Sequence, residues 1–153
     1  MTILQMTTNF EDVSYKQWFS YNKLEGNWIV DWGDGCIEVN TIHHIYEQDG
    51  IYQITVRGDF KASSLLCPDN IISLDKEEGC GIIELDACFH CCHQLISVPH
   101  DWDVSKVESM QSMFNDCVSF NQDLSHWNLE KVETANMFKN CPIEEKHKPK
   151  GLK

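Results

Sequence analysis

The sequence has few basic residues and no long hydrophobic run. Lys and Arg number 12 against 24 Asp and Glu, which gives a formal net charge of −12. This balance argues against a nucleic acid ligand, because phosphate groups are bound mainly by Lys and Arg. No apolar run approaches the roughly 20 residues that a membrane helix needs. We therefore expect no nucleic acid partner and no membrane partner, and an acidic surface that suits a basic protein partner or solubility alone.

Targeting and catalytic signals are also missing. The N-terminal stretch MTILQMTTNFEDVSYKQWF has no basic start, no long apolar segment and no small-residue cleavage site, so it does not resemble a secretory signal. We expect a cytoplasmic protein, with an unrecognised export route as the alternative. The sequence contains no G-x-S-x-G, H-E-x-x-H, P-loop or G-x-G-x-x-G pattern. We therefore expect no enzymatic activity and no cofactor.

The C-terminal half repeats with a period of 25 residues. Aligned pairs include Phe89 with Phe114, Cys92 with Cys117, and Trp102 with Trp127. The last copy is one residue shorter, so the chain carries two full units and one truncated unit. Such a unit cannot bury its apolar side alone, and stacking the units into a short solenoid solves this problem. Within a unit, the apolar spacing of VESMQSMFNDC predicts a short amphipathic helix or tight helical turns.

The N-terminal part favours strands instead. Two stretches rich in Ile, Val, Tyr and Trp are broken at GDG and QDG, which are turn signals. Tyr52, Ile54 and Val56 alternate with polar residues, as in a half-buried strand. We expect an α+β fold in which a small β-sandwich caps one end of the solenoid. The expected parts are a sandwich (1–60), a connector with the first solenoid strand (61–81), the repeats (82–141) and a flexible Lys-containing tail (142–153).

Two family resemblances are carried by these motifs. The stretch WDVSKVESMQSMFNDCVSFNQDLSHW resembles the BspA-like leucine-rich-repeat family, and the resemblance extends over residues of about 71–141. The stretch WIVDWGDG, followed by the H-x-Y motif of His44 and Tyr46, is similar to PKD-like β-sandwich domains and covers residues of about 1–60. Both resemblances imply interaction or adhesion modules, and neither implies catalysis.

Cysteine and histidine are concentrated in CFHCCH. Cys88, His90, Cys91 and His93 have the side chains that zinc prefers, and a zinc site in this region is one alternative. The repeat register, however, places Cys88 and Cys92 at core positions. No C-x-x-C pair has a matching partner pair, so we favour core and surface residues and expect no metal.

Asp31 and Asp34 flank the glycine turn in DWGDG. They suit either paired carboxylates for acid and base catalysis or calcium binding, or a structural role. We favour the structural role, in which their side chains accept hydrogen bonds from the turn.

Seven acidic residues lie between the apolar positions of the repeats and should point outward. They form either a solvated face or a docking surface for a basic protein. We expect a monomeric, non-enzymatic protein-binding module, and more specifically an immunity or inhibitor protein against a basic toxin such as a nuclease. The alternatives are a cell-surface adhesion protein and a zinc-binding protein. The partner-binding residues we expect are Asp101, Asp103, Glu108, Asp116, Asp123, Glu130 and Glu133.

Overall fold

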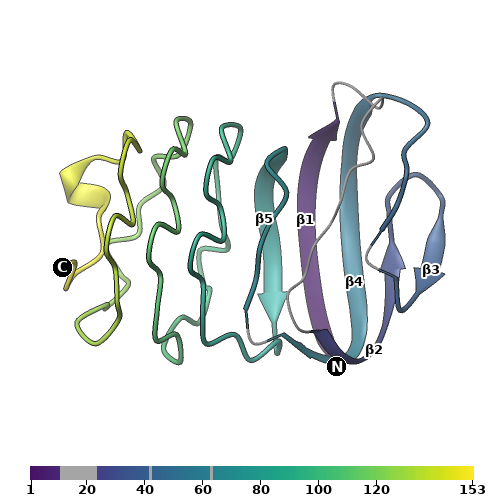
Figure 1. Cartoon of the computed structure of the whole chain (residues 1–153), viewed down its shortest axis with the longest axis horizontal. Coiled ribbons are helices and arrows are strands. Elements are labelled where there is room, and N and C mark those ends of the chain that lie inside the picture. The colour runs from purple at the N-terminus through teal and green to yellow at the C-terminus, as the bar shows by residue number, and fades with distance from the viewer. Residues whose placement is uncertain (11–23, 42, 63) are drawn as a thin grey trace.

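The computed structural model describes residues 1–10, 24–41, 43–62 and 64–153. The N-terminal half forms one five-stranded sheet in the order β3-β2-β4-β1-β5, with every neighbouring pair antiparallel (Figure 1). The strands are β1 (Thr2–Phe10), β2 (Leu24–Asp31), β3 (Ile37–Val39), β4 (Gly50–Ala62) and β5 (Ile71–Glu78).

The central strand β4 confirms the strand expected from alternating residues around Tyr52. It pairs with β1 on one side and β2 on the other. On its core side Ile54, Val56 and Phe60 are almost fully buried. β1 follows the same rule, because buried and half-buried residues alternate along its whole length. The sheet therefore has one face in the hydrophobic core.

The expected α+β fold class, with a sandwich and a solenoid, is wrong. The described residues contain no α-helix, and a single open sheet takes the place of the sandwich. Apolar residues three or four apart also fit consecutive tight turns, which is how VESMQSMFNDC is built. Ser112 and Asp116 have φ angles of 55° and 61°. Residues in this left-handed region cannot continue a right-handed helix. The described residues thus contain no helix that is long and apolar enough to cross a membrane.

The turns after β5 lie side by side along the long axis of the molecule (Figure 1). Isolated parallel bridges join Glu84 to Ser109 and Ser109 to Glu133. The spacing between these bridged residues is 25 and then 24. The left-handed conformations recur at the same spacing. They are found at Ala87, Ser112 and Asn136, and at Cys91, Asp116 and Asn140.

β5 connects the sheet to these turns. It pairs with β1, and its Ser73 forms a parallel bridge with Ser97. The amide of Leu74 also donates to the carbonyl of Ser97 at 3.1 Å. Buried side chains from both halves form one hydrophobic cluster. The junction between sheet and turns is therefore part of the core.

The C-terminal residues, for which a flexible tail at 142–153 is expected, pair with the preceding turns. The Lys150 amide donates to the Trp127 carbonyl at 3.1 Å, and the Leu129 amide donates to the Lys150 carbonyl at 2.8 Å. Ile143 is buried, and the 3₁₀ helix η1 (Glu145–His147) follows it. These residues cover the open end of the stack of turns.

Candidate functional site: an acidic cavity at the junction

A cavity of about 600 Å³ opens where the end of β5 faces the turn that carries Trp102. One wall comes from residues 75–79, at the end of β5, and the other from residues 99–107. Segments about 25 residues apart in the sequence thus meet because β5 packs beside the first turns. The acidic residues that line the cavity are Asp75, Glu77, Glu78, Asp101 and Asp103.

Trp102 and Glu77 form the most constrained part of the wall. The Trp102 side chain is only 5% exposed, and its Nε1 donates a hydrogen bond to Glu77 Oε2 at 2.9 Å. The other oxygen of Glu77 accepts a hydrogen bond from the Cys80 amide, also at 2.9 Å. Both carboxylate oxygens are therefore held, and the Glu77 charge is fixed at the cavity wall.

Asp75 is held in a similar way. Its carboxylate accepts hydrogen bonds from the hydroxyl of Ser73 at 2.5 Å and from that of Thr7 at 2.7 Å. The charge at the end of β5 is thus also fixed by neighbours in the sheet. Fixed acceptors lose little conformational entropy when a cation binds to them.

The charges around the cavity are unbalanced. Among the described residues that line the cavity, five are acidic and two are lysines, Lys76 and Lys106, and the N-terminal amino group also acts on Glu78. Lys76 Nζ pairs with Glu78 Oε2 at 2.9 Å, and this hydrogen bond holds the pKa of Glu78 below its usual value. Asp101 acts on the same pKa in the opposite direction through like-charge repulsion. A cation placed between Glu78 and Asp101 would relieve that repulsion.

Only two of the seven acidic residues expected to bind a partner line this cavity. They are Asp101 and Asp103, and both are exposed. The amide of Ser105 donates to Asp103 Oδ1 at 3.0 Å. Hydrogen bonds with the hydroxyl and amide of Ser105 lower the pKa of Asp103, so this carboxylate stays ionised in the turn.

The other five acidic residues lie outside the cavity lining, and three of them have evident local roles. Asp116 accepts a hydrogen bond from Asn140 Nδ2 at 2.7 Å. Asp123 accepts one from the Ser125 amide at 2.9 Å, which repeats the turn made by Asp103. Glu133 pairs with Lys153 at 3.4 Å. The lining does not include Glu108, Asp116, Asp123, Glu130 or Glu133.

Asp75, Glu77 and Glu78, which also line the cavity, were not singled out by the sequence reasoning. The available signal was the charged stretch DKEE, which directly follows the largely apolar strand residues IISL. A strand that ends in several charges carries them to the rim of the sheet, where a packed neighbour can turn that rim into a cavity wall. The sequence does not say which turn packs there.

The glycine turn after β2 has the structural role expected of it. The Gly33 amide donates to Asp31 Oδ1 at 3.0 Å, and the Cys36 amide donates to Asp34 Oδ1 at 2.9 Å. Gly33 and Gly35 have φ angles of 82° and 95°, a region that favours glycine. The interpretation of Asp31 and Asp34 as turn-stabilising residues is confirmed by these hydrogen bonds.

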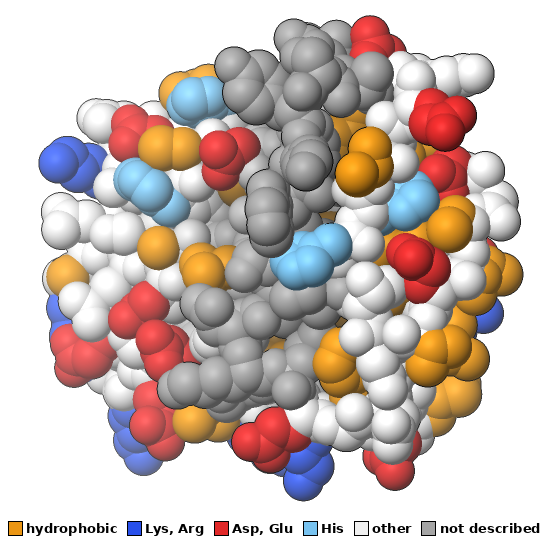
Figure 2. All heavy atoms as spheres, turned by 45° about the vertical axis from the view of Figure 1, so that its right-hand side comes forward, with side chains coloured by type: hydrophobic (Ala, Val, Ile, Leu, Met, Phe, Trp, Pro, Cys, Tyr) orange, Lys and Arg blue, Asp and Glu red, His pale blue; other side chains and the backbone are white. Residues whose placement is uncertain are grey.

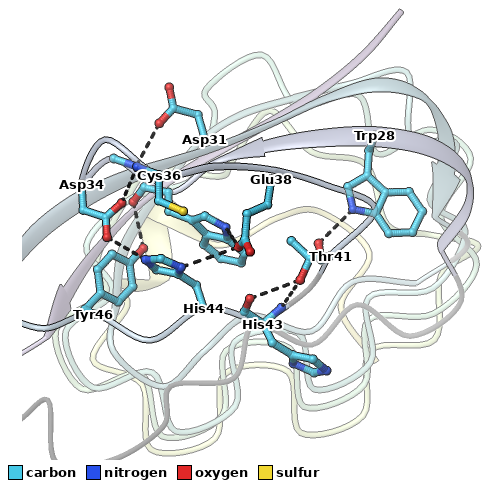
Figure 3. Close-up of polar contacts among 11 residues, drawn as sticks. Trp28, Asp31, Asp34, Cys36, Glu38, Thr41, His43, His44 and Tyr46 are labelled. Atoms are coloured by element: carbon cyan, nitrogen blue, oxygen red, sulfur yellow. Dashed lines mark hydrogen bonds and ion pairs between the residues drawn. The ribbon is translucent and has the colours of Figure 1, made fainter.

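A compact polar cluster surrounds His44 next to this turn (Figure 3). His44 Nε2 lies 2.6 Å from Asp34 Oδ2, and His44 Nδ1 lies 3.7 Å from Glu38 Oε2. Burial raises the pKa of Asp34, but hydrogen bonds from His44 and from the Cys36 amide outweigh it, and the net pKa is lowered. Burial, followed by the charges of Glu38 and Asp34, raises the pKa of the Cys36 thiol.

The four residues of the zinc alternative do not converge in one place. Cys88 is buried, and its Sγ lies 4.0 Å from Cys67 Sγ. His90 and Cys91 instead lie beside Asp116, with ligand atoms within 4.8 Å of one another. In the described part of the chain, neither Cys88 nor His93 belongs to such a group.

Exposed hydrophobic residues mark the outer face of β2 and β3. Ile29 and Val39 are register partners, and together with Ile37 they are 51% to 68% exposed. Figure 2, which turns this end of the molecule forward, shows hydrophobic side chains gathered on the right of the view among acidic ones. This face differs in chemistry from the acidic cavity.

Comparisons with known proteins place part of this architecture in a family. A family model matches residues 60–146, which is more than half of the chain and contains the whole cavity lining. Strands β1, β2 and β3 and the His44 cluster lie outside the match. No curated protein and no solved structure matches the chain. The chain therefore belongs to the family described as "Mycoplasma protein of unknown function, DUF285".

Proposed function

We propose that the protein is a non-enzymatic module that binds a basic protein partner through the acidic cavity. One observation carries the proposal: among the described residues that line the cavity, five carboxylates from two distant segments stand against two lysines. The whole chain adds a net charge of −12, which attracts a basic partner over distances up to the Debye length.

The cavity has the chemistry expected for a Lys or Arg side chain. Asp75 and Glu77 are held by hydrogen bonds, so their oxygens are positioned before the partner arrives. Asp101 is exposed and repels Glu78, so an incoming cation gains from both charges. Charge-assisted hydrogen bonds of this kind are the strong ones.

The more specific form of the proposal is an immunity or inhibitor protein against a basic toxin such as a nuclease. A nuclease must carry a basic surface to bind phosphate groups, and an acidic inhibitor both attracts that surface and covers it. The resemblance of the repeats to BspA-like proteins supports a binding role in general. It also supports the alternative of a cell-surface adhesion protein.

The test is affinity capture from a lysate of the source organism at low and at high salt. The wild-type chain is compared with an Asp101→Asn/Asp103→Asn double variant. Asn at 103 keeps the oxygen that accepts from the Ser105 amide, so the turn is preserved. The matched control is Asp123→Asn/Glu130→Gln, which removes the same two charges outside the cavity and preserves the equivalent turn at Ser125.

We expect one basic protein that the wild type and the control capture at low salt, that the cavity variant captures weakly, and that high salt releases. Equal capture by the cavity variant and the control would contradict a role for the cavity. Binding to intact cells or matrix, with no protein captured from the lysate, would favour adhesion instead.

A further inference from the structure

Three different metal-binding side chains converge beside the turn that follows β2. Cys36, Glu38 and His44 offer a sulfur, an oxygen and a nitrogen atom, all within 4.8 Å of one another. Glu38 alternates along β3 with the exposed Ile37 and Val39, so its side chain lies on the opposite side of the strand. Cys36 is two residues before Glu38 and shares that side.

The His44 ring is oriented with one nitrogen toward these ligands. Its Nε2 lies 2.6 Å from Asp34 Oδ2, while its Nδ1 points to Glu38 Oε2 at 3.7 Å (Figure 3). When Nε2 donates its proton to Asp34, the neutral ring has a free electron pair on Nδ1. A carboxylate that fixes a histidine in this way is the usual arrangement behind a metal-binding histidine.

Asp34 is itself fixed, because its Oδ1 accepts from the Cys36 amide at 2.9 Å. The same turn therefore positions the supporting carboxylate and the thiol. This explains why the charge of Asp34 faces His44.

Aromatic residues hold the other parts of the cluster. The Trp32 ring stacks on His44 with centroids 5.0 Å apart and an interplanar angle of 12°. Trp32 Nε1 donates to Glu38 Oε2 at 2.7 Å, so the same residue orients a second ligand. The Tyr46 hydroxyl donates to the Trp32 carbonyl at 2.8 Å. The His44 and Glu38 side chains are thus positioned by partners of their own.

We propose that Cys36 Sγ, a Glu38 carboxylate oxygen and His44 Nδ1 bind a Zn²⁺ ion. Bond lengths in zinc sites imply distances of about 3.3–3.7 Å between neighbouring ligand atoms of a tetrahedron. The observed separations are 3.7 Å for one pair and no more than 4.8 Å for the others. Closure thus needs the ligand atoms to approach one another by about 1.5 Å at most, which rotation of the side chains between rotamers can supply. Three protein ligands leave the fourth position to water.

The group of His90, Cys91 and Asp116 is the natural comparison. There, His90 Nε2 faces the neighbouring Cys91 Sγ at 3.4 Å, and Asp116 already accepts from Asn140. The two groups contain the same kinds of ligand, but of the two histidines only His44 has a carboxylate at hydrogen-bond distance within the described residues. Variants of the second group therefore serve as matched controls.

The test is a Co²⁺ titration of the reduced full-length chain after removal of metals with a chelator. Co²⁺ replaces Zn²⁺ in such sites, and a bound thiolate gives a charge-transfer absorption band. We expect saturation at one Co²⁺ per chain, with a thiolate band that one equivalent of Zn²⁺ abolishes. The absence of stoichiometric Co²⁺ binding would overturn the proposal.

Variants then locate the ion. Cys36→Ser should remove the thiolate band, while Cys91→Ser and His90→Gln should leave it unchanged. Asp34→Asn keeps the oxygen that accepts from the Cys36 amide and should weaken Zn²⁺ binding by about 10–100-fold. Circular dichroism of each variant checks that the sheet is intact. A thiolate band that survives Cys36→Ser, or that is lost with Cys91→Ser, would overturn the assignment.

Discussion

The rings of Phe89 and Phe114 lie nearly parallel, with centroids 5.5 Å apart and an interplanar angle of 19°. Phe138 continues the column at 5.4 Å from Phe114 and at 2°. Phe114 therefore has an aromatic neighbour on both sides, and it is fully buried. One column of side chains connects three successive turns, so its middle residue should matter most for stability.

Replacing Phe114 with Ala should lower the free energy of unfolding by about 3–5 kcal/mol, because it opens a cavity in the middle of the column. Phe138→Ala is the matched control, since Phe138 is only partly buried at the end of the column. Phe138→Ala should lower the free energy of unfolding by less than Phe114→Ala does. Urea unfolding curves measure both values, and equal losses would contradict the description of a continuous column.

Gly58 marks a close approach between β4 and β2. A methyl group at this position would lie 2.2 Å from the Asn27 carbonyl oxygen and 2.8 Å from Trp28 Cα. Gly58→Ala should therefore lower the free energy of unfolding by about 1–3 kcal/mol. For Gly50→Ala, on the same strand, the three nearest atoms all belong to the movable Tyr52 side chain, at 3.3 Å. Thermal unfolding of the two variants should separate them, and a Gly58→Ala variant as stable as Gly50→Ala would show that the strands are further apart.

The folded protein should lose stability at low pH because the Asp34 carboxylate becomes protonated. Its folded pKa is below the ordinary 3.8, so at low pH the unfolded chain takes up this proton more readily than the folded chain does. The contribution of Asp34 is therefore present above pH 3.8 and is lost as pH falls through the folded pKa.

The measurement is the melting temperature between about pH 5 and pH 3 for the wild type and Asp34→Asn. The wild type should lose more stability than the variant over this interval, because the variant has no proton to take up at this position. Parallel plots of melting temperature against pH would mean that the contact between Asp34 and His44 does not stabilise the folded protein.

The buried thiols should resist alkylation in the folded protein. Burial raises the pKa of Cys117 to about 12, and its Sγ donates to the Phe89 carbonyl at 3.0 Å. At pH 8 only about one molecule in ten thousand would carry this thiolate. Iodoacetamide labelling followed by mass spectrometry should modify the partly exposed Cys91 well before Cys117, and denaturant should make both reactive. Equal labelling rates in the folded protein would contradict the buried position.

The strands could be predicted where side chains alternate. Tyr52, Ile54 and Val56 predicted a strand, and β4 contains them. This inference works because one face of the sheet is buried, so burial imposes a period of two. The alternation does not reveal whether a second sheet covers that face. The sandwich inferred from the strand and turn signals thus went beyond what the alternation shows, and the described residues form a single sheet instead.

The spacing of apolar residues alone could not decide whether the repeats form helices or tight turns. Val107, Met110 and Phe114 fall on one side both in a helix and in a series of turns. The left-handed φ angles of Ser112 and Asp116 exclude a continuous helix. Glycine is the usual sequence signal of such φ angles, and neither of these residues is a glycine. Backbone hydrogen bonds between successive turns, such as Phe114 N to Met137 O at 2.9 Å, replace those of a helix.

The candidate sites were predicted only in part. Asp101 and Asp103 were expected as binding residues because they lie between apolar repeat positions, and they line the cavity. The opposite wall comes from β5, and only the packing of β5 against the repeats brings it there. Cys36 and Glu38 carried a weak signal, since residues two apart share one side of a strand. The turn that brings His44 to them had no signal in the spacing.

The most direct measurement is nuclear magnetic resonance mapping of the captured basic partner on the labelled chain. The account predicts that the largest chemical-shift changes occur at residues 75–79 and 99–107, including the Trp102 indole N–H that donates to Glu77. These changes should diminish at high salt. Changes concentrated at Ile29, Ile37 and Val39, with the Trp102 signal unmoved, would contradict it.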